Sequence, residues 1–288
     1  MIGTVSVVIP TYNRAGTVER AVESVLGQTH QPIEIVVVDD GSSDDTSEQI
    51  LRAFPRVRVL RQENLGVSAA RNRGIAATSG DWIALLDSDD EWRPSKLEEQ
   101  LRAIGTQPDH LICHTDEIWI RHGRRVNPKT KHAKSGGWIF EKCLPLCSIS
   151  PSSVLLHRRL LSEVGHFNED LPACEDYDLW LRVCSRYPVL FINKPLVVKY
   201  GGHPDQLSRT IWGLDRFRIQ ALENLLSTDE LSSDQQKQAM ATLLTKIDIF
   251  VSGAEKRGRL DEAEKYKAKR ARWEAAQDWI LEQAEAQR

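Results

Sequence analysis

Two hydrophobic periodicities alternate along the first hundred residues. Four short runs are β-branched and almost continuously apolar, as expected of strands buried on both faces: VSVVI (5–9), IEIVVV (33–38), VRVL (57–60) and WIALL (82–86). Between them, residues 15–28, a stretch from Ser42 or Ser43 to Phe54, and residues 66–79 follow helical spacing. This alternation predicts βαβ units and a mostly parallel, Rossmann-like sheet flanked by helices.

The pattern loosens from about residue 108. Residues 110–120 and 191–200 read as strands, residues 151–167 as a strand and a short helix, and residues 175–187 as a helix. Beyond Ser208 the chain is predicted to be almost wholly helical. We therefore expect an α/β fold with a sheet half over residues 1–108, a smaller α+β half over 109–210 and a C-terminal helical extension over 211–288.

Composition and charge exclude several classes of protein. The 288 residues carry 41 acidic and 38 basic side chains, so the net charge of −3 offers no basic excess for nucleic acid. The five cysteines form no CxxC pair, which argues against a disulfide framework or a zinc knuckle. There is no signal-peptide pattern and no apolar run of the about 18 residues that span a bilayer. We expect a cytoplasmic protein, or one peripheral to the inner face of a membrane.

Polar side chains follow three of the predicted strands where each strand ends. They are Pro10, Thr11, Tyr12 and Arg14 after the first strand, Asp39 and Asp40 after the second, and Asp87, Ser88, Asp89 and Asp90 after the fourth. Ligands of an open parallel sheet bind beyond the carboxyl ends of its strands, so these groups share one edge. An aromatic ring can stack on a base, and carboxylates can accept from a base or ribose or hold a divalent cation against phosphates. Each motif alone is also a good turn.

Four segments, in this order, resemble the family 2 glycosyltransferases, which are inverting enzymes of the GT-A fold. They are VSVVIPTYNRAGTVERAVESVL, IEIVVVDDGSSDDT, ENLGVSAARNRGIAATSGDWIALLDSDD and EDYDLWLR, and the likeness covers roughly residues 4–210. The resemblance implies transfer of a sugar from a nucleoside-diphosphate sugar, most often a UDP-sugar, to a hydroxyl of a saccharide or lipid-linked saccharide. It also implies a Mg²⁺ or Mn²⁺ cofactor and a role in making surface polysaccharides or glycoconjugates.

The same resemblance assigns roles to individual residues. Asp87-Ser88-Asp89 corresponds to the family's DXD motif, with Asp87 near the ribose and Asp89 on the metal. Pro10, Thr11, Tyr12 and Asp39 would line the nucleoside pocket, where Asp39 accepts from the base. The segment from Asn64 to Asn72, with Gly66 and Arg71, would close over the nucleotide, and Arg14 and Asp40 complete the nucleotide-binding candidates.

Glu175 and Asp176 are the candidate catalytic bases. The incoming hydroxyl must lose a proton to a carboxylate on the far face of the sugar. In the family the corresponding Glu-Asp pair supplies this base, usually through its Asp, so we expect Asp176 ahead of Glu175. Because the pair opens a predicted helix, whose N-terminal dipole favours anions, a capping role is the alternative.

Several further features leave a functional and a plain structural interpretation open. His203 lies where a loop of the family can reach the diphosphate or metal, but a surface loop fits equally well. Residues 121–134 carry six Lys or Arg and no acid, which suits an anionic acceptor, a lipid pyrophosphate, a membrane surface or a solvated β-hairpin. The C-terminal helices would pack on the catalytic domain or form a homodimer, with Trp273 and Trp279 as anchors. Asp90 and Glu91 are expected to cap a helix that begins near Pro94.

Two other functions fit part of the sequence. A non-catalytic member of the same fold would bind a nucleotide sugar or a partner protein without turnover. A phosphatase of the haloacid-dehalogenase type also has a strand followed by DxD, but that family places the motif after the first strand and wants Thr or Val where Asp90 stands. A dehydrogenase lacks its GxGxxG here, and a P-loop NTPase lacks its GxxxxGK[ST].

Overall fold

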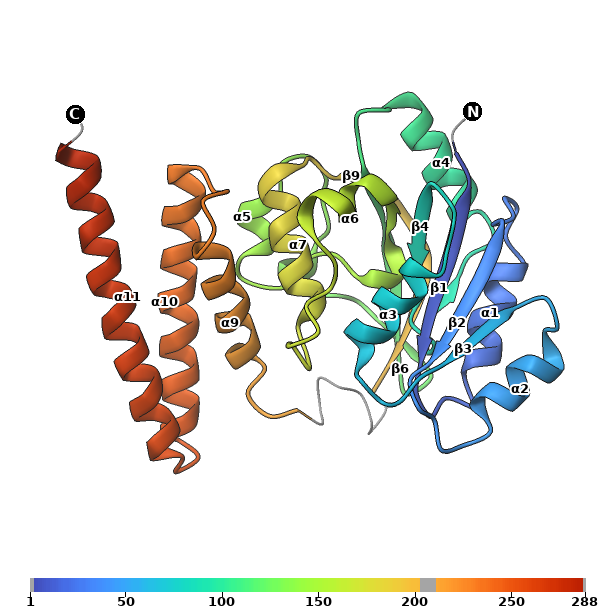
Figure 1. The fold of residues 1–288 in the computed structure, drawn as a ribbon, viewed down its shortest axis with the longest axis horizontal. Helices are drawn as coiled ribbons and strands as arrows, with labels where there is room; N and C mark the ends of the chain where they lie inside the picture. Colours follow the sequence, from blue (N-terminus) through green and yellow to red (C-terminus); the bar gives the residue numbers. More distant parts are fainter. Residues whose placement is uncertain (1–2, 203–210, 287–288) are drawn as a thin grey trace.

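A twisted, mixed β-sheet lies at the centre of the protein, in a computed structural model that describes residues 3–202 and 211–286 (Figure 1). The strand order is β3-β2-β1-β4-β8-β6-β9-β5, and β7 pairs with β6. The strands are β1 (Val5–Thr11), β2 (Glu34–Asp39), β3 (Arg58–Arg61), β4 (Trp82–Leu85), β5 (Glu91–Trp92), β6 (Ile112–Arg121), β7 (Arg124–Val126), β8 (Leu155–His157) and β9 (Leu190–Gly201).

Helices cover both faces of this sheet. They are α1 (Val18–Leu26), α2 (Thr46–Ala53), α3 (Val67–Ala76), α4 (Lys96–Thr106), α5 (Phe140–Cys143), α6 (Arg158–Val164) and α7 (Glu175–Arg186), with short 3₁₀ turns η1 (Thr130–His132) and η2 (Pro151–Ser153). Val7 of β1 packs in a cluster with α1, α2 and α4, while its neighbour Val8 packs in the opposite cluster with α3, α6 and α7. Successive side chains of one buried strand therefore point to opposite faces and pack in two separate hydrophobic clusters, as expected of a sheet covered on both faces.

The first half of the sheet is parallel and the second half is mixed. β1 pairs in parallel with both β2 and β4, and β2 with β3, which confirms the predicted βαβ units. β8 then runs antiparallel between β4 and β6. Since β8 is antiparallel to both β4 and β6, β6 runs in the same direction as β4. Its parallel neighbour β9 runs in that direction as well. The carboxyl ends of β1, β2, β4, β6 and β9 consequently meet at one edge.

Two expected helix caps are wrong. α2 begins at Thr46 after Asp45, because Ser42 and Ser43 instead bind Asn13 in the loop after β1: Ser42 Oγ accepts from the Asn13 amide, and the Ser43 amide donates to Asn13 Oδ1. α4 begins at Lys96 after Ser95, so Asp90 and Glu91 do not cap it. Glu91 belongs to β5, and Asp90 is buried in an ion pair described below.

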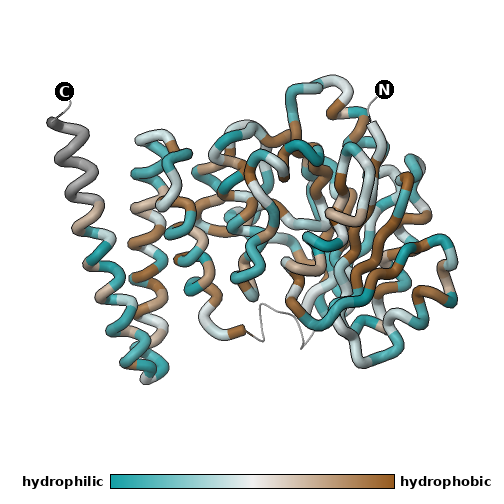
Figure 2. Tube along the Cα trace, viewed as in Figure 1, coloured by the Kyte–Doolittle hydropathy of each residue, from teal (hydrophilic) through white to brown (hydrophobic). Residues whose placement is uncertain are grey.

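Three long helices follow the sheet: α9 (Asp215–Leu226), α10 (Ser233–Glu255) and α11 (Leu260–Ala286). Their apolar side chains join one hydrophobic cluster with α7 and the adjoining strands, so this extension and the sheet share a core (Figures 1 and 2). Ser232 and Gln235 form a capping box at the start of α10, and Gln235 also donates to the Ser185 carbonyl of α7. The indole of Trp273 donates to Glu223 at 2.8 Å. The side chain of Trp279 lies outside the described part, and the homodimer stays a prediction.

In the described part of the chain, no helix is both long enough and apolar enough to cross a membrane.

Gly74 lets α3 approach β1 closely, which yields a prediction for stability. A Cβ at Gly74 would lie 2.3 Å from Val8 Cγ1, whereas a Cβ at the exposed Gly16 would meet nothing within 4 Å. We expect Gly74→Ala to lower the free energy of unfolding by about 1–3 kcal/mol, since overpacking outweighs the better helix propensity of alanine. Gly16→Ala should change it by less than about 1 kcal/mol. Urea denaturation of both variants measures this, and equal stabilities would contradict the close packing.

Candidate active site

The β1 end of the shared edge offers an exposed ring and a buried hydroxyl. Tyr12 is 45% exposed, although it follows a strand whose residues are all buried. Thr11 is buried, and its Oγ1 has no hydrogen-bond partner among the described residues. Nearby on α3, the buried Ser68 Oγ is also unpartnered. Buried hydroxyls are normally satisfied, so these atoms point to a missing ligand.

Asp39 and Asp40 are both buried at the end of β2 and mainly organise the loops around them. Asp39 accepts from the Ser42 amide at 2.9 Å and from the Ser47 hydroxyl, and Arg61 Nε lies 3.6 Å from its Oδ2. Asp40 accepts from the side chain of Gln62 and from the amides of Leu65 and Gly66.

These bonds fix the loop before α3. A Cβ on Gly41, which has a φ of +80°, would lie 2.8 Å from the Asn64 amide nitrogen, so only glycine permits this approach. The loop places Asn64 in solvent and leads through Gly66, with a φ of +93°, into α3.

Arg71 of α3 joins two carboxylates from distant parts of the chain. Its Nη2 donates to Asp87 Oδ1 at 2.8 Å, and its Nη1 donates to Glu175 Oε1 at 2.5 Å. The guanidinium is buried beside the Phe167 ring, and its Nε has no partner in the described part. A rigid guanidinium that binds two carboxylates fixes them relative to each other. The DXD motif and the start of α7 therefore belong to one site.

The three aspartates of the acidic run have different electrostatic partners. Burial would raise the pKa of Asp87, but Arg71 and then Lys199 hold it below its ordinary value. Burial raises the pKa of Asp90 to about 8, although Lys199 lies 3.7 Å away. Burial and then the charge of Asp87 raise the pKa of Asp89 as well. Within the described residues the carboxylate of Asp89 has no direct ion pair, and the more distant charges of Lys199 and Arg14 only partly offset the rise in its pKa. Ser88, between Asp87 and Asp89, is buried.

Glu175 and Asp176 open α7 as predicted, and they lie in different surroundings. Glu175 is buried against Arg71, and burial raises its pKa against the pull of that arginine. Asp176 is partly exposed. Its Oδ1 accepts from the Tyr177 amide at 2.7 Å, and its Oδ2 lies 3.1 Å from the Cys147 thiol. Asp178 is occupied by Arg182 at 2.7 Å. The geometry favours Asp176 over Glu175 as a proton acceptor.

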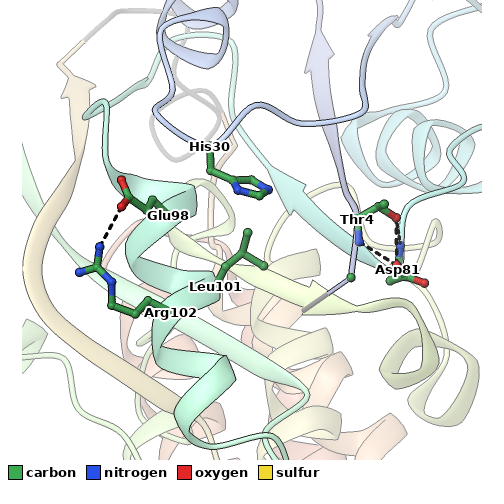
Figure 3. A pocket seen from close by; sticks show the side chains of 7 residues that line it. Thr4, His30, Asp81, Glu98, Leu101 and Arg102 are labelled. Carbon is green, nitrogen blue, oxygen red and sulfur yellow. Dashed lines mark hydrogen bonds and ion pairs between the residues drawn. The ribbon is translucent and has the colours of Figure 1, made fainter. Parts of the chain in front are cut away.

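A separate hollow of about 780 Å³ lies at the opposite edge of the sheet, lined by Thr4, His30, Asp81 and Leu101 among others (Figure 3). Thr4 and Asp81 bind each other there, just before β1 and β4 begin. Parallel sheets bind ligands at the carboxyl ends of their strands, so this hollow is not the predicted site.

The comparisons with known proteins identify the family of this chain. A sequence model described as "Glycosyl transferase family 2" matches residues 6–162. The chain belongs to the family 2 glycosyltransferases. The glucosyltransferase WfgD of Escherichia coli, named for UDP-Glc and α-D-GlcNAc-diphosphoundecaprenol, is 34% identical over 66% of this chain and 73% of its own. Uncharacterized glycosyltransferases of Rickettsia bellii and Rickettsia felis are 35% and 36% identical over 67% and 72% of this chain. The chain spans only 28% and 35% of the length of these two.

Solved structures show the fold of this glycosyltransferase. TarS of S. aureus in complex with UDP-GlcNAc aligns with a TM-score of 0.67 at 19% identity, over 85% of this chain and 71% of that chain. A second, longer TarS structure gives a TM-score of 0.66 over 84% of this chain and 43% of that chain. The fold is therefore the predicted GT-A fold.

Sequence reasoning missed the residues that balance the acidic run. Lys199 of β9 donates to Ser150 Oγ at 2.9 Å, and the surrounding carboxylates raise its pKa above the ordinary value even though burial lowers it. The hydroxyl of Ser152 donates to Asp90 at 2.6 Å and accepts from the Asp87 amide. The sequence held a signal for Lys199, because it lies at the carboxyl end of the strand LVVKY, where the rule applied to the other strands also holds.

The residues of this glycosyltransferase fit a divalent cation. The described residues contain no group of three or more His, Cys, Asp or Glu side chains that could hold a metal. Mg²⁺ and Mn²⁺ need fewer protein ligands, since they use one or two carboxylates together with substrate phosphates and water. Asp89 supplies a hard oxygen donor whose charge is not balanced by a direct partner. His203, the other metal candidate, lies outside the described residues.

The Arg71 bridge predicts a large stability difference between a buried and an exposed ion pair. Arg71→Met leaves Glu175 buried without its counter-charge and removes the direct partner of the half-buried Asp87, and we expect it to lower the free energy of unfolding by about 3–5 kcal/mol. Adding Glu175→Gln should restore part of that loss, because a neutral amide needs no counter-charge. Arg102→Met breaks exposed pairs with Glu98 and Glu99 and should cost less than about 1 kcal/mol. Chemical denaturation compares them, and similar losses for the two arginine variants would disprove the bridge.

Proposed function

We propose that this glycosyltransferase moves a sugar from a UDP-sugar to an acceptor hydroxyl with inversion at the anomeric carbon, using Mg²⁺ or Mn²⁺. The observation that carries the proposal is the Arg71 bridge, which brings Asp87 and the residue before Asp176 onto one guanidinium. Donor and base candidates therefore share one site. The UDP-Glc in the name of WfgD and the UDP-GlcNAc bound to TarS support a uridine donor. The pathway would be synthesis of a surface polysaccharide or another glycoconjugate.

The nucleoside would bind at the ends of β1 and β2. Tyr12 offers an exposed ring for stacking on the base, and Asp39 retains carboxylate lone pairs to accept from a base N–H. Thr11 Oγ1 and Ser68 Oγ would gain the partners that they lack. Asp87, held by Arg71 through Oδ1, keeps Oδ2 for the ribose.

The transfer would be a single displacement. The acceptor oxygen attacks the anomeric carbon from the face opposite the nucleotide, its proton passes to Asp176, and the nucleoside diphosphate leaves with the bonding electron pair. A bound divalent cation supplies charge neutralisation to the leaving diphosphate. Asp176 suits the proton transfer because its carboxylate is oriented by two uncharged groups, the Tyr177 amide and the Cys147 thiol. Glu175 would act by holding Arg71.

Asp176→Asn tests the base and separates an enzyme from a non-catalytic binder. We expect sugar transfer to fall by about 10²–10⁴-fold, because the amide cannot accept the proton, while UDP binding by calorimetry is retained. Asp170→Asn, an exposed change of the same chemistry in the loop before α7, should keep activity. Full activity in Asp176→Asn would refute its assignment as the base.

Asp89→Asn tests the metal site by thermal shift with UDP, with and without Mn²⁺. The wild-type protein should gain stability with ligand concentration, by about 2.7 kcal/mol at a hundredfold excess over the dissociation constant. Asp89→Asn should lose the Mn²⁺-dependent part of that gain and keep the metal-independent part. Asp109→Asn, at an exposed position, should respond like the wild type. An undiminished Mn²⁺ response in Asp89→Asn would rule out this ligand.

A further inference from the structure

Four cations of the hairpin formed by β6 and β7 and of the segment after it lie close to one aromatic pair or to each other. We define the basic hairpin surface as Arg121, Arg124, Lys129 and Lys131 together with the rings of Trp119 and His132. The two rings lie 5.4 Å apart, and the Arg121 guanidinium lies 5.6 Å from the Trp119 ring centre. All four cations are exposed.

The hairpin places two like charges directly opposite each other. Arg121 pairs with Arg124 across a two-residue turn, His122-Gly123, in which both residues have a positive φ. Like charges in facing positions destabilise a strand pair. A hairpin with only a structural role would gain from a neutral or acidic residue at one of these positions, so the arrangement indicates a bound anion.

The other cations of the surface add to this charge. Burial, and then the charges of Lys131, Arg121 and Lys129, lower the pKa of His132. The same basic residues therefore act on one ring and form one positive surface.

No carboxylate in residues 3–202 or 211–286 pairs with any of the four cations. Elsewhere some exposed basic side chains, such as Arg61, Arg102 and Arg159, each bind a glutamate, so the four cations differ from these in lying close together with no carboxylate partner in the described part of the chain. The basic hairpin surface is thus an uncompensated positive field on a chain whose net charge is −3.

The position of the hairpin relates it to the proposed transfer site. β6 runs in the same direction as β4, so its carboxyl end lies on the same edge as Asp87 and Asp89. Arg121 is in register with Gly201 at the end of β9, two residues beyond Lys199. A Cβ on Gly202 would lie 3.0 Å from the His122 ring, so the turn packs against the chain that leaves β9.

We propose that the basic hairpin surface binds the diphosphate group of a lipid-linked acceptor and holds it at the edge of the transfer site. This inference rests on the proposed function and identifies the acceptor class. Two arginine guanidinium groups can each donate two hydrogen bonds to phosphate oxygens, and two lysines add positive charge opposite the negative charge of a diphosphate. A general membrane-binding surface is less well supported, because none of the large apolar side chains that are exposed in the described residues lies between 119 and 135. The lipid diphosphate in the name of WfgD is of this chemical class.

The test compares two kinds of vesicle and two charge-matched variants. The hairpin variant carries Arg121→Gln, Arg124→Gln and Lys131→Gln, and the control carries Arg52→Gln, Arg56→Gln and Lys237→Gln, which are exposed positions elsewhere. Binding is measured without donor on phosphatidylcholine vesicles that contain a polyprenyl diphosphate, and on phosphatidylglycerol vesicles of equal surface charge. We expect the wild type and the control to prefer the diphosphate vesicles, and the hairpin variant to bind them at least about tenfold more weakly. Its thermal stability should not fall, because facing like charges are removed.

A second measurement uses inorganic pyrophosphate and the imidazole resonances. A bound anion stabilises the imidazolium, so pyrophosphate should raise the pKa of His132 in an NMR titration and leave the resonances of His30, at the opposite edge, unchanged. Equal binding by the hairpin variant, or no response of His132, would overturn the proposal. Equal binding of the wild type to both vesicle types would show that the surface binds anionic membranes in general, and would overturn the proposal that it binds a diphosphate. Diphosphate binding through the hairpin by a protein that transfers no sugar would instead refute the proposed function.

Discussion

The acidic run after β4 can be buried only because two cations from distant segments reach it. Arg71 of α3 binds Asp87, and Lys199 of β9 lies beside Asp90. Burying an unpaired carboxylate costs several kcal/mol, so the run could not occupy this position on an isolated strand. The two cations leave Asp89, between the paired aspartates, without a direct counter-charge. Burial and then the charge of Asp87 raise the pKa of Asp89, and the charges of Lys199 and Arg14 offset only part of this effect.

The same charges hold separate parts of the fold together. Arg71 reaches from the parallel half of the sheet to Glu175 at the first residue of α7. The residue before Glu175 is Cys174, whose φ of 63° is unusual for a side chain with a Cβ. Packing and the Arg71 bond must compensate for this conformation, because the chain would otherwise relax at that point. The start of α7, and with it Asp176, is thus fixed by contacts to residues about a hundred positions earlier.

Local patterns predicted the elements, and long-range contacts determined the roles within the site. β-branched runs such as VSVVI and IEIVVV favour strands buried on both faces, and β1 and β2 confirm this, whereas the expectation that VRVL is buried is wrong, because its residues 58–60 belong to β3 at the edge of the sheet and are exposed or half-buried. The parallel half and the edge that carries Asp39, Asp87 and Asp89 follow from the sequence. The strand and short helix expected over residues 151–167 are β8 and α6, but the antiparallel direction of β8 was not predicted, because so short a strand gives no signal of how it pairs. The pairing of Lys199 with Asp90 and the bridging role of Arg71 were not predicted, since no spacing rule relates residues that meet only in the folded sheet. Ser42 and Ser43 misled for the same reason, because their partner is Asn13 on another loop.

Charge pairing also separates the carboxylates that can do chemistry from those that cannot. Glu175 is buried and bound by the Arg71 guanidinium, so it is poorly placed to reach an acceptor hydroxyl, and Asp87, bound by the same guanidinium, serves better as a fixed acceptor. Asp176 is oriented by an amide and a thiol, neither of which cancels its charge, and Asp89 has no direct partner in the described residues. Asp89 and Asp176 adjoin, along the chain, the two carboxylates that Arg71 binds, Asp87 and Glu175. Asp89 would hold a cation at the leaving phosphate, and Asp176 would accept the proton of the incoming hydroxyl. Because the two carboxylates come from different parts of the chain, the leaving and incoming groups can bind at separate positions of one site, as a displacement requires.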